Sequence, residues 1–208
     1  MAVNPLDIAS HGPVVPVIVI DRVEDALPLA EALLAGGVKV LEVTLRTAAG
    51  LPAIEAITRQ LPEAVVGVGT VLNADDARRA SEAGARFAVS PGYTPEVGSA
   101  CKALDLPLLP GVATSSEVMA ALADGFSFLK LFPAEAVGGM ALLKSWASPF
   151  GGVAFCPTGG ITPASAPGYL ALPNVRCVGG SWLTPQDAVR AGDWARITTL
   201  ARAAQGLR

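Results

Sequence analysis

Short apolar runs alternate with stretches that carry helix signals along the whole chain. Residues 14–20 hold only apolar side chains, including one proline, which is typical of a strand covered on both faces. Similar runs recur at intervals of 20 to 26 residues. They begin near Val14, Val38, Ala64, Phe87, Pro107, Phe128, Val153 and Val175. The pattern therefore predicts eight strands separated by helices.

Capping residues mark the expected helices. Asn73 is followed by two acids, Thr94 precedes a proline and an acid, and Thr47 precedes a run with helical spacing. Helix ends are expected at Gly36, Gly84 and Gly125.

This alternation of strands and helices predicts an α/β fold with parallel strands, because each helix carries the chain back to the same end of the sheet. Eight such units can close into a (β/α)8 TIM barrel. We expect a single domain over residues 1–208, with short helices and with residues 1–12 as a leading helix or cap. An open, doubly wound sheet is the alternative.

The composition is apolar, with 51% hydrophobic residues, 16% charged residues and a mean hydropathy of +0.49. No run approaches the roughly 20 apolar residues that a membrane-spanning helix needs, so we expect no membrane association. The apolar surplus indicates a deeply buried sheet and a subunit interface. A net charge of -3 with scattered arginines gives no basic stripe, which argues against nucleic-acid binding.

The N-terminal residues lack the basic and apolar regions of a signal peptide, so we expect a cytoplasmic protein. Cys101, Cys156 and Cys177 are widely spaced and are interpreted as reduced core thiols. His11 is the single histidine, which argues against a histidine-based metal site or a Ser-His-Asp triad. We therefore expect no metal and no cofactor.

Lys130 is the most informative residue, because it lies within the apolar run at residues 126–133. It alternates with Phe128 and Phe132, so all three should point to one face of a strand. Burial among aromatic rings favours the neutral amine, which attacks carbonyl carbon and forms a Schiff base. The alternative is a lysine that extends to solvent at the sheet rim or pairs with a carboxylate.

Glu42 should project inward from the end of the second strand, as Lys130 does from the sixth. The two side chains would then form an acid/base and nucleophile pair, with a purely structural ion pair as the alternative. Arg46 follows four residues later and could bind a substrate carboxylate, or pair with a surface acid. Thr70 and Thr158 share the inward direction and are candidate site hydroxyls.

Glycine pairs follow the last two strands, at Gly159-Gly160 and at Gly179-Gly180-Ser181. Many barrels bind phosphate at this place through exposed backbone amides, and a short helix starting near Ser181 would direct its positive end to the anion. The alternative is that these glycines only form tight turns.

The strand ends resemble a known family, 2-keto-3-deoxy-6-phosphogluconate (KDPG) aldolase, together with the related 4-hydroxy-2-oxoglutarate (KHG) aldolase. The similarity runs nearly end to end and rests on six motifs in order. These are Glu42-Val-Thr-Leu-Arg46, Gly69-Thr70, Ser90-Pro91-Gly92, Phe132-Pro-Ala-Glu135, Phe155-Cys-Pro-Thr-Gly-Gly160 and Gly179-Gly-Ser-Trp182. The resemblance implies a metal-free class I aldolase, typically a homotrimer, which yields pyruvate and glyceraldehyde 3-phosphate in the Entner–Doudoroff route.

The resemblance also assigns roles to individual residues. It implies that Lys130 forms the Schiff base with the keto carbon and that Glu42 moves protons. It implies that Arg46 and Thr70 hold the pyruvate carboxylate. The remaining implied substrate-binding residues are Pro91 and Phe132 as pocket walls, Thr158 near the substrate hydroxyls, and Gly159, Gly160, Gly180 and Ser181 at the phosphate.

Two other functions fit parts of the pattern. A phosphosugar isomerase or epimerase on the same barrel would share the phosphate site and use Glu42 as a base. A non-catalytic sugar-phosphate sensor would bind the same ligand without turnover. Only the aldolase requires the amine of Lys130 in its aromatic setting.

Overall fold

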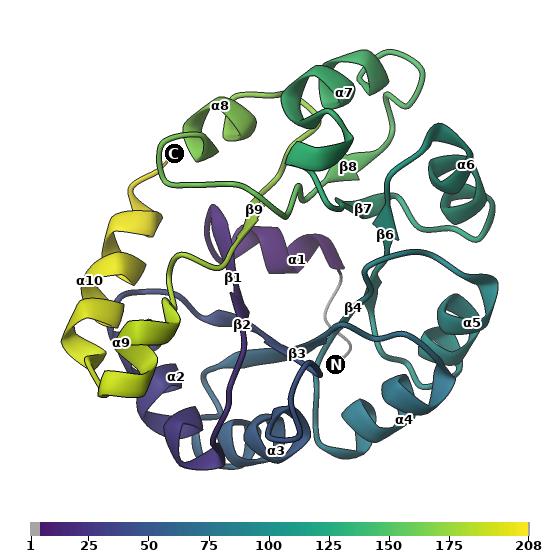
Figure 1. The fold of residues 1–208 in the computed structure, drawn as a ribbon. Coiled ribbons are helices and arrows are strands. Elements are labelled where there is room, and N and C mark those ends of the chain that lie inside the picture. Colours follow the sequence, from purple (N-terminus) through teal and green to yellow (C-terminus); the bar gives the residue numbers. More distant parts are fainter. Residues whose placement is uncertain (1–4, 208) are drawn as a thin grey trace.

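Short parallel strands and helices alternate along residues 5–207, the part of the chain that the computed structural model describes. The strands are β1 Val14–Ile18, β2 Val40–Thr44, β3 Val65–Gly69, β4 Ala88–Val89, β5 Leu108–Leu109, β6 Gly111–Val112, β7 Phe128–Leu131, β8 Ala154–Phe155 and β9 Val178–Gly180. The α-helices are α1 Pro5–Ser10, α2 Ala26–Ala35, α3 Gly50–Gln60, α4 Ala74–Glu82, α5 Pro95–Ala103, α6 Ser115–Ala123, α7 Gly139–Trp146, α8 Ala166–Leu170, α9 Gln186–Ala191 and α10 Trp194–Gln205. Two short 3₁₀ helices span Val23–Asp25 and Glu135–Val137. Figure 1 shows helices α2 to α10 on the outside of a ring of strands, with α1 across its middle.

The strands pair in parallel, which confirms the α/β class. Their ladders form a six-stranded sheet in the order β5-β4-β3-β2-β1-β9 and a three-stranded sheet in the order β6-β7-β8. Isolated parallel bridges, Phe155 with Val175 and Thr158 with Gly179, join the region of β8 to that of β9. The single closed eight-stranded sheet expected from the sequence is therefore present as two sheets.

The division between the sheets falls within the fifth expected strand. Leu108–Leu109 pairs with β4, whereas Gly111–Val112 pairs with β7. Pro110 separates the two segments; it lacks a backbone N–H, but its carbonyl accepts a hydrogen bond of 2.8 Å from the N–H of Lys130. One expected strand thus becomes β5 and β6.

Most expected helix starts are confirmed by their capping bonds. The Asn73 side chain accepts from the N–H of Asp76 at the start of α4, and Thr94 accepts from Val97 at the start of α5. The expectation for Thr47 was wrong. Helix α3 begins at Gly50, and the Thr47 hydroxyl donates instead to the carbonyl of Ile20.

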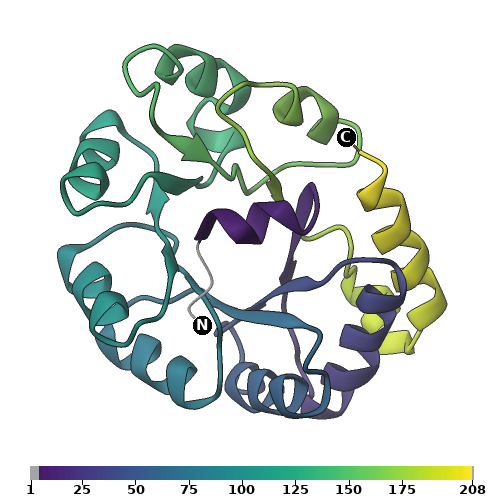
Figure 2. The same cartoon turned by 180° about the vertical axis from the view of Figure 1, so that it is seen from behind.

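Helix α1 lies across one end of the ring of strands, where it is seen from behind in Figure 2. Its residues Ile8 and Ala9 pack in the inner cluster with Val15, Val40 and Phe128, which lie in the early parts of their strands. Residues 1–4 of the expected leading segment 1–12 lie outside the described residues. The opposite end of the ring, where the strands finish, carries the predicted site residues.

Two further expectations can be compared with this fold. Cys101, Cys156 and Cys177 are buried and form no disulfide among the described residues. Within residues 5–207, no helix combines the length and the apolar character needed to cross a membrane.

Candidate active site

The side chains of Lys130 and Glu42 meet inside the ring of strands. Lys130 lies in β7 and Glu42 in β2, and each residue is only 3% exposed. Lys130 Nζ donates to Glu42 Oε1 at 3.3 Å, the only buried ion pair among the described residues. The alternation of the sequence therefore predicted correctly that both residues point inward and lie close together.

Glycines in the neighbouring strand make room for this pair. A Cβ atom at Gly69 would lie 2.4 Å from Glu42 Oε1, and one at Gly67 would lie 2.3 Å from the ring of Phe87. Real Cβ atoms do not approach so closely. The β3 sequence Val65-Val-Gly-Val-Gly69 thus leaves space for the Phe87 ring at Gly67 and for the Glu42 carboxylate at Gly69.

The aromatic ring of Phe132 also lies close to the amine of Lys130. The Lys130 Nζ lies 5.2 Å from the centroid of the Phe132 ring, within the range of a cation–π contact. Phe132 directly follows β7 and is half-buried. The expected face shared by Phe128, Lys130 and Phe132 is confirmed by this contact and by the place of Phe128 in the inner cluster.

Arg46 and Thr70 interact at the rim of the ring. The Arg46 Nε donates to Thr70 Oγ1 at 3.2 Å, and Arg46 is exposed in the segment after β2. Thr70 has a φ of 65°, in the left-handed region that a β-branched residue rarely adopts. This backbone conformation comes directly after β3, where the hydroxyl can face the guanidinium.

A pocket of about 100 Å³ opens beside these residues. It is lined by Val17, Arg46, Phe132, Thr158, Gly159, Gly160, Ile161, Gly179 and Ser181. The pocket therefore joins an arginine, a threonine hydroxyl and glycine backbone from the ends of β2, β7, β8 and β9. Five of the predicted site residues are not among its lining residues: Glu42, Thr70, Lys130, Gly180 and Pro91. Pro91 follows β4, where its carbonyl lies against Gly111.

The glycine pairs have steric reasons to be glycine. Gly159 and Gly160 have φ values of 102° and 81°. A Cβ atom at Gly179 would lie 2.1 Å from Thr158 Oγ1, and one at Gly180 would lie 2.2 Å from the Trp182 ring. The expected turn geometry and the expected anion site are thus compatible at these positions.

The expectation of a short helix starting near Ser181 was wrong. Residues 181–183 form a bend and turn, in which the Thr184 N–H donates to the Ser181 carbonyl at 3.2 Å, and α9 begins only at Gln186. Pro185 lies between the turn and this six-residue helix. Any anion held here must therefore be bound by loop amides and the exposed Ser181 hydroxyl, without a helix starting at that serine.

Comparison with known proteins agrees with this geometry. A family model described as KDPG and KHG aldolase matches residues 7–200. The chain belongs to this aldolase family. A 2-dehydro-3-deoxy-phosphogluconate aldolase of Pseudoalteromonas atlantica is 52% identical over 202 residues, covering 97% of this chain and 94% of the relative. A KHG/KDPG aldolase of Escherichia coli K12 is 54% identical over 197 residues, covering 95% and 92%.

Solved aldolases of this family have the same fold. The KDPG aldolase of Legionella pneumophila is 47% identical, with a TM-score of 0.97 over 99% of this chain and 100% of that one. That crystal structure contains pyruvate captured at low pH as a covalent carbinolamine intermediate. The aldolase of Zymomonas mobilis ZM4, solved with 3-phosphoglycerate, is 51% identical with a TM-score of 0.93, covering 98% of this chain and 96% of that one.

Within this aldolase chain, sequence reasoning missed three lining residues. Val17 is inward-facing in β1, where the alternation of Val15 and Val17 was an available signal. Gly179 was noted in the sequence only as part of the Gly179-Gly180-Ser181 motif and was not named as a binding residue. Ile161 directly follows Gly159-Gly160, and nothing in the sequence marked it. In the described part of this aldolase, no group of three or more His, Cys, Asp or Glu side chains could hold a metal ion.

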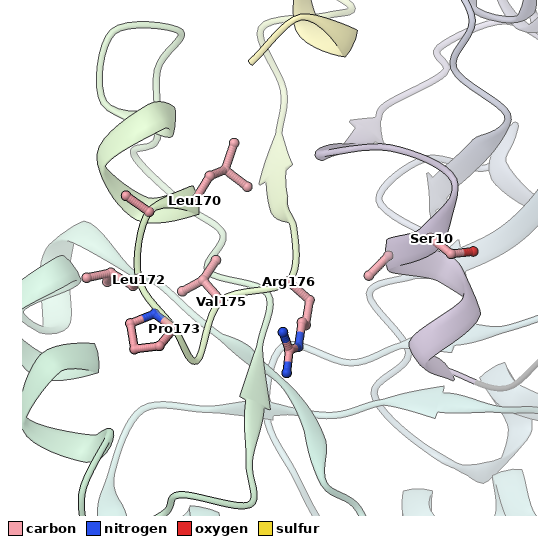
Figure 3. Close-up of a pocket in the computed structure, with 8 residues that line it drawn as sticks. Ser10, Leu170, Leu172, Pro173, Val175 and Arg176 are labelled. Carbon is pink, nitrogen blue, oxygen red and sulfur yellow. The ribbon is translucent and has the colours of Figure 1, made fainter. Parts of the chain in front are cut away.

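A larger pocket lies away from the strand ends. Its volume is about 640 Å³, and it lies between α1 and the segment 170–176 that precedes β9. Figure 3 shows Leu170, Leu172 and Val175 on one side and Ser10 on the other, with Arg176 between them. Its lining contains none of the predicted site residues, so pocket size alone does not locate the chemistry of this aldolase.

The conformation of Thr70 gives the first testable prediction. We expect Thr70→Gly to be about 1 kcal/mol more stable than Thr70→Ala, because only glycine relieves the left-handed strain. The alanine variant is the matched control, since it also lacks the hydroxyl that Arg46 contacts. Urea unfolding of both variants would measure the difference. An alanine variant as stable as the glycine variant would contradict the assigned strain.

Proposed function

We propose that this chain is a class I aldolase that cleaves 2-keto-3-deoxy-6-phosphogluconate into pyruvate and glyceraldehyde 3-phosphate through a Schiff base on Lys130. The observation that carries the proposal is the buried Lys130 amine, 3.3 Å from the Glu42 carboxylate and 5.2 Å from the ring of Phe132, which lines the glycine-rich pocket. Membership of the KDPG and KHG aldolase family supports it, as does the carbinolamine captured in the Legionella relative. We extend the proposal to 4-hydroxy-2-oxoglutarate because relatives carry both names.

The chemistry begins with attack of the Lys130 amine on the C2 keto carbon of the substrate. The resulting carbinolamine loses water and becomes a protonated imine. Glu42 then accepts the proton of the C4 hydroxyl, the C3–C4 bond breaks, and its electron pair enters the enamine while glyceraldehyde 3-phosphate leaves. Protonation of the enamine at C3 and hydrolysis of the imine release pyruvate and restore the free amine.

We assign the substrate contacts along the pocket from the amine outward. Arg46, oriented by its bond to Thr70, holds the carboxylate next to the keto carbon. Phe132, which lines the pocket, limits the space around the pyruvate end. Pro91 is proposed as a second wall of that end, outside the lining of this pocket. Thr158, 5% exposed, lies near the substrate hydroxyls.

The phosphate end of the pocket is assigned to backbone amides. Gly160 is exposed and Gly159 is half-buried, so their main chain can be approached, and Ser181 adds an exposed hydroxyl. Gly180 is assigned to the same end of the pocket, although it is buried beside the Trp182 ring. No cofactor and no metal take part in the proposed mechanism, because the protonated imine itself accepts the electrons.

We also infer the larger organisation. The two sheets are proposed to form one (β/α)8 TIM barrel in a single domain over residues 1–208, with β5 and β6 as one strand interrupted at Pro110. The bridges between the regions of β8 and β9 support this closure. A homotrimer and a cytoplasmic location are further proposals. Exposed Leu72 and Met119, at 61% and 62%, provide apolar surface that a subunit interface could cover.

An isomerase or epimerase would use the same pocket without a covalent adduct, and a sugar-phosphate sensor would bind without turnover. Borohydride treatment in the presence of pyruvate separates all three, because only an enzyme that forms an imine becomes permanently modified.

We predict that Lys130 is the lysine that pyruvate and borohydride modify, and that Lys130→Ala abolishes both trapping and cleavage. Lys130→Arg should also be inactive, because a guanidinium stays protonated and cannot form the imine. This variant still provides a cation beside Glu42. Peptide mass mapping would locate the adduct. Lys102 is the matched control: its Nζ lies 4.9 Å from the Phe126 ring, but the residue is exposed. Modification of Lys39, Lys102 or Lys144 in place of Lys130 would refute the assignment.

Glu42→Gln should preserve the fold and reduce turnover by about 10²- to 10⁴-fold, the usual contribution of a positioned acid or base. Steady-state cleavage assays and circular dichroism would measure the two effects. Glutamine keeps the size and the oxygen that Lys130 contacts, and the amine can lose its proton once the counter-charge is gone, so the variant should fold with reduced stability. An unfolded variant would favour a purely structural ion pair, and full activity would exclude Glu42 from the mechanism.

Ser181→Asp should raise the KM for the phosphorylated substrate by about tenfold or more, because a carboxylate would face the substrate phosphate. Ser181 is exposed, so the fold should be unaffected, and pyruvate trapping at Lys130 should stay normal. Ser181→Asn provides the uncharged control of equal size. Equal KM values for the two variants would place the phosphate elsewhere.

A further inference from the structure

The segment after Lys130 is tied to the glycine pair by backbone hydrogen bonds. The Ala134 N–H donates to the Thr158 carbonyl at 2.8 Å, and the Glu135 N–H donates to the Gly159 carbonyl at 3.1 Å. The strand that carries the amine and the loop assigned to the phosphate are therefore held together just beyond their strand ends. Glu135, which takes part in this connection, is exposed to solvent.

The side chain of Glu135 has two differently placed parts. Its stem lies against Gly160, because a Cβ atom there would meet Glu135 Cγ at 2.6 Å and Cβ at 2.7 Å. Its carboxylate is directed to the start of α7, where Oε2 would lie 3.6 Å from a Cβ atom at Gly139. The negative charge thus points away from the glycine pair that its own stem contacts.

Tyr169 in α8 fixes this direction. The Tyr169 hydroxyl donates to Glu135 Oε1 at 2.6 Å, and the Tyr169 side chain is completely buried. Burial raises the pKa of Tyr169, the bond to Glu135 raises it further, and a hydrogen bond from the Met140 backbone acts in the opposite direction. Gly139 leaves space for the phenol, since a Cβ atom there would lie 2.5 Å from its oxygen.

We propose that Tyr169 holds the Glu135 carboxylate away from the phosphate end of the pocket, so that the pair determines affinity for phosphorylated substrates. Tyr169 and Glu135 are positioning residues in this proposal, since neither is assigned a contact with the substrate. The proposal rests on the proposed function only in assigning the phosphate to Gly159 and Gly160. Without the phenol, the exposed carboxylate can turn over Gly160 and repel the anion.

The test uses three variants and two readouts. Tyr169→Phe removes the hydrogen bond and keeps the ring, Glu135→Gln removes the charge, and the double variant combines both. Binding of glycerol 3-phosphate, measured by calorimetry, reports the phosphate end without any chemistry. Borohydride trapping of pyruvate reports Lys130 without any phosphate.

We expect Tyr169→Phe to weaken glycerol 3-phosphate binding by about fivefold, a modest effect because salt and water screen the freed charge. Glu135→Gln should bind it at least as well as the unmodified protein. The double variant should recover binding to within about twofold, because the repelling charge is gone. Trapping of pyruvate should be unchanged in all three variants.

Tyr93→Phe is the matched control, because the Tyr93 hydroxyl also donates to a carboxylate, that of Asp124. Tyr93 lies before α5, away from the glycine pair at residues 159 and 160. This variant should leave glycerol 3-phosphate binding unchanged. Parallel loss of phosphate binding and pyruvate trapping in Tyr169→Phe would show a general structural role and overturn the proposal. Weak binding that persists in the double variant, or no effect of Tyr169→Phe, would overturn it as well.

Failure of the proposed function would look different. An unmodified protein that binds glycerol 3-phosphate but does not trap pyruvate would refute the Schiff base and leave the comparison of the three variants valid. A protein that traps pyruvate but binds no glycerol 3-phosphate would refute the phosphate site and this inference together.

Discussion

A lysine amine and a glutamate carboxylate are costly to bury, because neither regains inside a protein all the stabilisation that water provides. Lys130 and Glu42 nevertheless lie inside the ring of strands at 3% exposure each. Branched apolar residues of similar volume would stabilise such an interior at least as well. The surrounding sequence fits the pair, since β3 has a glycine at position 69, where any side chain would clash with the Glu42 carboxylate. This is the expected arrangement when two groups are retained for chemistry and the fold adjusts around them.

The sequence predicted the side chains inside the ring of strands better than the contacts between residues that follow the strands. Alternation along a strand sets the direction of each side chain, so the inward positions of Lys130 and Glu42 could be read from their neighbours. The bond between Arg46 and Thr70 could not be read in this way, because both residues lie in segments after strands. The positive φ of Thr70 had no signal in the sequence, since threonine is rarely found in that conformation.

The errors at element boundaries have local physical causes. Pro110 divides the fifth strand because it cannot donate to the ladder, and the apolar pattern does not register this change. Thr47 was read as a helix cap, but its hydroxyl is used by the carbonyl of Ile20. A turn at residues 181–184 replaces the expected helix. Pro185 disfavours helical backbone at Thr184, so α9 starts only after the proline, at Gln186. In each case a single proline or hydroxyl contact decided between alternatives that the pattern left open.

Helix α1 covers one end of the ring with Ile8 and Ala9, so among the described residues the site of Lys130 opens toward the end where the strands finish. In the proposed reaction, substrate, products and water then share this entrance. In the proposed reaction the aldehyde fragment is held by the outer glycine loops, between the enamine and this entrance. It must depart before bulk water can reach the imine, and until then the reactive carbon is shielded from premature protonation. The covalent bond to Lys130 sets the order of release in the proposed reaction, with aldehyde first and pyruvate second. Helix α1 adds that both products leave from the same end of the ring.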